Sequence, residues 1–144
     1  MASILIVDGH SAIFGIESLA AEHAVNARKA RQMLVDWLNA YQDASDNPSV
    51  VVFDGRQAEG SREGGTESEV MVLYSERRMT ADIVIERIAG AQARKHQVFV
   101  ASNDRAVRES VMASGAEAFS IKHLEELLDR TLADFRQRWG GGGD

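Results

Sequence analysis

Carboxylates stand at or just past the ends of three apolar runs in this sequence. Asp8 follows the run 3–7, Asp54 follows 50–53, and Asp104 comes three residues after 98–101. Short runs rich in β-branched residues are typical of buried strands in a parallel sheet. Because ligands bind outside the carboxyl ends of such strands, we expect the three carboxylates to meet at one sheet edge.

Two further acids belong to the same expected edge. Asp82 opens the helix that follows the predicted strand 70–74, and Glu86 lies one turn later on the same helix face. Taken singly, Thr80 and Asp104 are also plausible helix caps, and Asp82 suits a first helical turn. The aspartate–glycine pairs at 8–9 and 54–55 are also compatible with simple turns. The recurrence of acids at one edge favours a shared site.

A cluster of carboxylates predicts a cation. Like charges brought together repel each other, and burying them is costly unless a cation or a proton compensates. A site made only of oxygen ligands favours a hard ion, here Mg²⁺ or Mn²⁺. Such an ion activates water and stabilises charge on a phosphate, so the cluster predicts metal-assisted phosphodiester hydrolysis.

Arginines flank these acids, although the net charge of −6 argues against a simple electrostatic nucleic-acid binder. We expect a local phosphate track, with Arg77 and Arg78 as the preferred pair and Arg105 beside Asp104. For each arginine alone, pairing with nearby acids on a solvated surface is the simpler interpretation. The arginines considered are Arg56, Arg62, Arg77, Arg78, Arg105 and Arg108.

The elements that must position these residues alternate between strands and helices. Strands are expected at 3–7, 50–53, 70–74, 98–101 and near 118–119, with helices over about 25–43, from 80, from 104 to 113, and from 121 to 139. This order predicts an α/β fold with three layers and a mostly parallel five-stranded sheet. The polar, glycine-rich stretch 55–68 predicts a mobile loop. Trp37 and Trp139 fall on apolar helix stripes and are expected in the core.

Length and composition predict one globular domain. With 144 residues, 44 % of them hydrophobic and 26 % charged, the sequence predicts a domain over residues 1–139 and a flexible glycine-rich tail over 140–144. There is no cysteine, which excludes disulfides and thiolate zinc sites. The start of the sequence is expected to be a strand rather than a signal peptide, and no run is long enough to span a membrane, so we expect a cytoplasmic protein.

Several segments, in this order, resemble the YacP-like branch of the NYN domain family of PIN-like ribonucleases. They are ILIVDG (4–9), VVFDG (51–55), TADIVIER (80–87), VASND (100–104) and GAEAFS (115–120), and Arg28 resembles an arginine in the helix after the first strand. The resemblance implies a Rossmann-like PIN fold and divalent-metal-dependent endonucleolytic cleavage of RNA, in some members mRNA in a translation context. It implies Asp8, Asp82 and Asp104 as the metal-binding catalytic set, with Glu86 and Asp54 in support.

The sequence departs from this family at residues 10 and 11. Family members usually read DGYN after the first strand, whereas this chain has His10 and Ser11. Ser11 is therefore expected to replace the hydrogen bonds of the asparagine, and His10 either contacts phosphate or metal or is a turn residue. The altered motif is similar to that of structure-specific 5′-nucleases, which leaves DNA as an alternative substrate.

A non-catalytic RNA- or protein-binding module is a further alternative, and the sequence is compatible with a monomer or a homodimer. A phosphate-accepting receiver domain is disfavoured because Asp8 lacks an adjacent acidic partner. A nucleotide-binding enzyme is disfavoured because no glycine-rich phosphate motif follows a strand.

Overall fold

A computed structural model of the chain describes residues 3–55, 61–63, 69–76 and 79–140, and it contains one mixed sheet. The strand order is β3-β4-β2-β1-β5-β6, and all neighbours are parallel except β3 and β4. The strands are β1 (Ser3–Asp8), β2 (Ser49–Phe53), β3 (Ser61–Glu63), β4 (Met71–Tyr74), β5 (Gln97–Ala101) and β6 (Glu117–Phe119). The five predicted strands form the parallel part of this sheet, which confirms the predicted fold class.

The loop predicted over 55–68 is wrong for the segment Ser61–Glu63, which is β3. This strand pairs with β4 from the sheet edge through backbone hydrogen bonds, in antiparallel register. Backbone pairing at an edge requires no apolar alternation, so the polar segment gave no strand signal. The predicted loop residues 56–60 and 64–68 lie outside the described residues.

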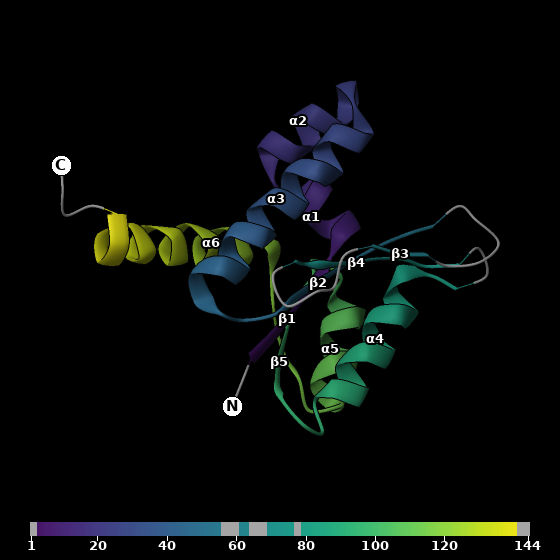
Figure 1. The fold of residues 1–144 in the computed structure, drawn as a ribbon. Helices are drawn as coiled ribbons and strands as arrows, with labels where there is room; N and C mark the ends of the chain where they lie inside the picture. Colours follow the sequence, from purple (N-terminus) through teal and green to yellow (C-terminus); the bar gives the residue numbers. More distant parts are fainter. Residues whose placement is uncertain (1–2, 56–60, 64–68, 77–78, 141–144) are drawn as a thin grey trace.

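Helices cover both faces of the sheet (Figure 1). Together with the sheet they give the predicted three layers. The first face carries α1 (Gly9–Gly15), α2 (Glu17–Val25), α3 (Ala27–Ser45) and α6 (Ile121–Phe135), and the second carries α4 (Ala81–Gln92) and α5 (Arg105–Ala113).

The central position of β1 in the sheet explains why its sequence is continuously apolar. Leu5 and Val7 belong to the core beneath α1, α3 and α6, whereas Ile6 belongs to the core beneath α4 and α5. A strand buried on both faces has no solvent-facing position for a polar residue. β1 therefore holds its carboxyl-terminal residue, Asp8, in the middle of the sheet edge.

The segment between β1 and β2 contains three helices, where the sequence predicted one over about 25–43. That helix is α3, which buries Ala30, Leu34 and Leu38 as the apolar spacing predicted. α1 and α2 were missed. α1 has only seven residues, and α2 buries only Leu19, so neither gives a clear helical period.

The last helix leaves the body of the protein, as Figure 1 shows for α6. Ile121, Leu124 and Leu128 are buried as predicted, but Trp139 is 72 % exposed, so its predicted place in the core is wrong. The apolar stripe of the sequence continues to Trp139, beyond the part of the helix that packs against the rest of the protein. Trp37, by contrast, packs partly buried against the core.

Gly140 ends the π-helical turn η1 (Arg136–Gly140), so the first residue of the predicted tail is helical. The rest of that tail, 141–144, lies outside the described residues. None of the helices in the described part of the chain combines the length and apolar character needed to cross a membrane.

Candidate active site

Asp8 is the most enclosed acid at the carboxyl edge of the sheet, with 3 % of its surface exposed. It is also the N-cap of α1 and accepts a hydrogen bond of 3.3 Å from the backbone N–H of Ser11. Its Oδ2 accepts two hydroxyl hydrogen bonds, from Ser11 at 2.8 Å and from Ser102 at 2.7 Å. These donors compensate the burial of the carboxylate and fix its orientation.

Ser102 joins Asp8 to the next carboxylate along the edge. This serine is fully buried just after β5, and its Oγ accepts the backbone N–H of Asp104 at 3.0 Å. Asp104 is in turn the N-cap of α5, where its Oδ1 accepts the backbone N–H groups of Ala106 and Val107. A network of backbone and hydroxyl donors therefore sets the relative positions of the two aspartates.

Asp54 lies at the end of β2, which flanks β1 on the side opposite to β5. Its Oδ1 accepts the backbone N–H of Ala81 at 2.9 Å, which ties the end of β2 to the first turn of α4. Because Ala81 directly precedes Asp82 in the chain, this hydrogen bond also fixes the position of the Asp82 backbone relative to Asp54. The predicted capping role of Thr80 is present as well, since its side chain accepts the N–H of Ile83.

The glycines after Asp8 and Asp54 are required by close approach between segments. A Cβ on Gly9 would meet the ring of Phe53, and a Cβ on Gly55 would meet the carbonyl oxygen of Ser75. The aspartate–glycine pairs are therefore not simple turns. Each lets a neighbouring strand approach the edge where the carboxylates lie.

Asp82 reports how close the acids are to one another. Burial raises the pKa of Asp82 above its ordinary value of 3.8, and repulsion from Asp8, Asp104, Asp54 and Glu86 raises it further, in that order. These four neighbours and Asp82 are the five carboxylates expected at this edge. They come from three adjacent strands and one helix, and they share one electrostatic environment.

The donor atoms of this cluster fit a hard cation. Among the hydrogen bonds between described residues, Oδ2 of Asp54 and Oδ2 of Asp104 accept none, and neither do the carboxylates of Asp82 and Glu86. In Asp54 and Asp104, one oxygen is thus used for orientation and the other is left for a ligand. Only oxygen donors are present, which suits Mg²⁺ or Mn²⁺.

The cluster is not a closed cage of direct ligands. In the part of the chain that the structure describes, no three acidic or histidine side chains form a group that could hold a metal ion by themselves. This arrangement fits an ion such as Mg²⁺, which keeps several waters and takes only one or two protein carboxylates. The expectation that these five acids bind a metal ion stays a prediction.

Ser11, expected to replace the hydrogen bonds of the family's asparagine and to lie at the substrate, differs in its surroundings from His10. The Ser11 hydroxyl donates to Asp8 and accepts the backbone N–H of Asn103 at 3.1 Å, so it helps to position the site, and its contact with substrate stays a prediction. His10 is exposed in the first turn of α1, not in a turn between elements, and its ring contacts that of Phe14.

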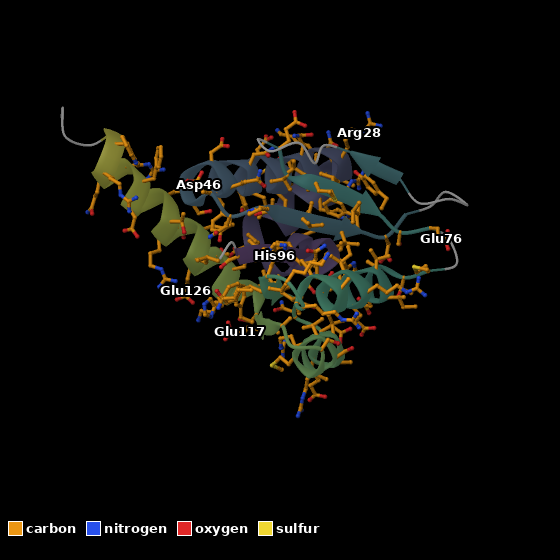
Figure 2. All side chains as sticks on the ribbon, turned by 60° about the horizontal axis from the view of Figure 1, so that its bottom comes forward. Arg28, Asp46, Glu76, His96, Glu117 and Glu126 are labelled. Atoms are coloured by element: carbon orange, nitrogen blue, oxygen red, sulfur yellow. The ribbon has the colours of Figure 1, made fainter. Side chains whose placement is uncertain are left out.

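The arginines predicted to form a phosphate track are described only in part. Arg105 is exposed and pairs with Glu109 at 2.9 Å, within α5. Arg28 is exposed at the surface, toward the end of α3 opposite Asp46 (Figure 2). Arg77, Arg78 and Arg56 lie outside the described residues, as does the side chain of Arg62. Arg108 donates to the backbone carbonyl of Ser102 at 2.8 Å and so supports the loop that carries Asp104.

Three polar residues that support the edge were not predicted. Ser102 links Asp8 to Asp104, Asn103 accepts the N–H of Ile121 through its side chain, and Ser75 donates toward Asp54 at 3.5 Å. The available signal was their position, since each directly follows a predicted strand or precedes a predicted cap. Serine and asparagine are common in such places, so position alone carries little specificity.

Comparison with known proteins agrees with the fold described above. The model of the YacP-like NYN domain matches residues 5–140. The uncharacterised protein YacP of Bacillus subtilis is 30 % identical over 133 residues, which cover 90 % of this chain and 78 % of the relative. Two crystal structures of Rae1 (YacP) from Bacillus subtilis match with TM-scores of 0.78, for a mutant, and 0.76, each at 26 % identity. The matches cover 94 % of this chain and 79 % and 78 % of those chains. This chain therefore belongs to the YacP-like NYN domain family, a family of PIN-like nucleases.

Proposed function

We propose that this protein is a divalent-metal-dependent endoribonuclease that hydrolyses RNA phosphodiester bonds at the carboxyl edge of its sheet. Asp8, Asp82 and Asp104 are the catalytic and metal-binding set, and Glu86 and Asp54 support them. The cofactor is Mg²⁺ or Mn²⁺. Membership of a nuclease family supports the reaction class.

The observation that carries this proposal is the convergence of acids from separate segments. Asp54, Asp8 and Asp104 follow the neighbouring strands β2, β1 and β5, and the helix bearing Asp82 begins beside Asp54. A fold that served only to pack a core has no need to gather negative charge at one place, because the repulsion lowers stability. A bound cation would turn this repulsion into attraction.

Some of these residues position the acids, and the acids themselves bind the metal ion. Ser11 and Ser102 hold Asp8 in one orientation, and the first turn of α5 holds Asp104. Asp82, repelled by its neighbours, gains most from a nearby positive charge. When bound, the ion would supply an activated water and stabilise the charge that develops on the phosphate. Holding the acids rigid before substrate arrives avoids the cost of arranging them during the reaction.

RNA is proposed as the substrate on the basis of family membership, and the protein as a cytoplasmic enzyme. Among the described residues, Arg28 and Arg105 are exposed and remain the candidates for phosphate contact, with Arg77 and Arg78 added from the sequence. The prediction for the last two is that Arg77→Ala/Arg78→Ala weakens RNA binding and flattens its salt dependence.

The test is incubation of the purified protein with single-stranded RNA, structured RNA and DNA, each with Mn²⁺ or with a chelator. Cleavage of RNA with Mn²⁺, lost with chelator and lost in Asp8→Asn, supports the proposal. Cleavage of DNA in preference to RNA would assign the 5′-nuclease-like alternative instead. Metal-dependent cleavage that survives in Asp8→Asn would remove the carboxylate cluster as its source.

One observation favours a second function, that of a non-catalytic RNA-binding module. The described acids do not form a preassembled group of three metal ligands. A binding module without catalysis would not need such a group, so this absence among the described residues is compatible with it. The same assay decides between the two functions, because a scaffold binds RNA with or without Mn²⁺ and cuts it in neither condition.

A further inference from the structure

Three aromatic rings form a row that starts in the first turn of α1, the helix whose N-cap is Asp8. The ring centroids of His10 and Phe14 are 4.7 Å apart, and those of Phe14 and His23 are 4.8 Å apart. His10 and Phe14 lie one turn apart on α1, and His23 is in the last turn of α2. The row begins two residues after Asp8 in the chain.

The central ring of this row faces water. Phe14 is 53 % exposed, although α1 has a buried face formed by Ala12 and Ile13. A single exposed apolar side chain is common in proteins and needs no explanation. The ring of Phe14 is tilted by 48° against that of His10 and meets that of His23 edge-on at 65°, so the three rings form a faceted aromatic surface. The half-exposed phenyl ring at its centre is open to a ligand.

The position of this row is fixed relative to the carboxylates. Near its start, α1 is held by the Ser11 hydroxyl, which bonds Asp8 and the N–H of Asn103. At its end, Gly15 lies so close to Asn103 that a Cβ there would be 2.8 Å from Asn103 Nδ2. A rigid surface loses little entropy when it binds a ligand, which favours its use in recognition.

The chemistry of this surface suits nucleobases of a single strand. Bases stack on aromatic side chains without sequence preference, because every base has a flat π-face. The protein is acidic overall, and the arginines that follow Asp104 are engaged, Arg105 with Glu109 and Arg108 with a backbone carbonyl. Stacking on these rings would add affinity to the phosphate contacts proposed for the exposed Arg28 and Arg105. Bases inside a duplex are covered by their neighbours and unavailable for such stacking.

We propose that His10, Phe14 and His23 form a base-stacking surface that binds an unpaired stretch of RNA next to the phosphate to be cut. The inference rests on the proposed function for its substrate and deepens it, since it makes single-stranded RNA the preferred form. Phe14 is the central residue, and the two histidines extend the surface on either side of it.

The test is a binding measurement in chelator, so that no cleavage is needed. The probe is a short single-stranded RNA that carries a fluorescent adenine analogue, whose emission changes on stacking. Phe14→Ala is expected to weaken binding about 5- to 150-fold and to remove the emission change. Phe14→Tyr, which keeps the aromatic ring, is expected to bind like the unaltered protein.

Met112→Ala is the matched control, because Met112 is 49 % exposed on α5, which covers the opposite face of the sheet from α1 and α2. Its binding should be unchanged. The same RNA annealed to its complement should show no difference between the unaltered protein and Phe14→Ala. Equal binding of the single strand by Phe14→Ala, equal losses in Phe14→Ala and Phe14→Tyr, or an equal loss with duplex would each overturn the inference.

A separate cleavage assay distinguishes this inference from the proposed function. If RNA is cut and the loss in Phe14→Ala is confined to KM, both stand. If no RNA is cut while binding still depends on Phe14, the stacking surface stands and the nuclease proposal fails. If RNA is cut at the same KM in Phe14→Ala, the nuclease proposal stands and the stacking surface is overturned.

Discussion

The Ser102 hydroxyl donates a 2.7 Å hydrogen bond to Asp8 Oδ2, across the ends of the neighbouring strands β5 and β1. The same oxygen of Ser102 accepts the backbone N–H of Asp104. One buried serine thus connects two of the three proposed catalytic acids. Its role is to position them, since none of its surface is exposed to a substrate.

Ser102→Ala should therefore affect both stability and activity. The substitution leaves the buried Asp8 with one hydroxyl donor fewer and the N–H of Asp104 without its acceptor, which is expected to cost about 1–3 kcal/mol. Urea unfolding measures this change. Ser114→Ala is the control, because the Ser114 hydroxyl is exposed and only makes a 3.4 Å hydrogen bond to the Ser110 carbonyl. Similar effects of both substitutions would contradict the positioning role of Ser102.

Asp82→Asn should raise Tm by a few degrees in metal-free buffer at neutral pH, because it removes the cost of burying this charge and also its repulsion by four acids. The sign follows from linkage. A raised carboxyl pKa means that the folded protein binds this proton more tightly than the unfolded chain does, so stability falls as pH rises from the ordinary value of 3.8 to the raised value. The advantage of Asp82→Asn should therefore shrink as pH falls toward 3.8.

Thermal melts over a pH series measure this effect, with Asp129→Asn on the exposed side of α6 as control. Asp129 is exposed on α6, away from the carboxylates at the sheet edge, so its substitution should change Tm little. An Asp82→Asn protein that is less stable than the unaltered protein at neutral pH would show that the Asp82 charge is not destabilising at this edge.

The two glycines Gly55 and Gly90 should respond in opposite directions to alanine. In Gly55→Ala the new methyl group would collide with the Ser75 carbonyl, so we expect a loss of about 1–3 kcal/mol or more. In Gly90→Ala the nearest atoms are 3.8 Å away, inside α4, so we expect a gain of about 0.5–1 kcal/mol. Denaturant unfolding of both variants decides this. A stable Gly55→Ala protein would mean that β2 and the segment after β4 tolerate separation.

The sequence predicted the parts of the fold that depend on periodic or continuous apolar residues. β1, β2 and β5 are buried on both faces and read as uninterrupted apolar runs, and α3 shows its stripe clearly. β3 and α2 were missed because one is held by backbone pairing at an edge and the other buries a single leucine. Local composition carries little information about either kind of element.

The residues of the candidate site also divide into those with a sequence signal and those without one. The acids at the ends of strands could be placed at one edge because parallel strands share their direction. The serines that orient them could not be identified, since the hydrogen bond from Ser102 to Asp8 joins residues 94 positions apart. Trp139 was misplaced for a related reason, because the periodicity of α6 continues beyond the point where it has a partner to pack against.

The most direct test of the account is the titration of the metal-free protein with Mn²⁺, followed by calorimetry, alongside single-turnover cleavage of a single-stranded RNA. The account predicts that Mn²⁺ binds the unaltered protein and promotes cleavage, and that Asp82→Asn loses both while keeping its fold by circular dichroism. Mn²⁺ binding and cleavage at unchanged levels in Asp82→Asn would contradict it.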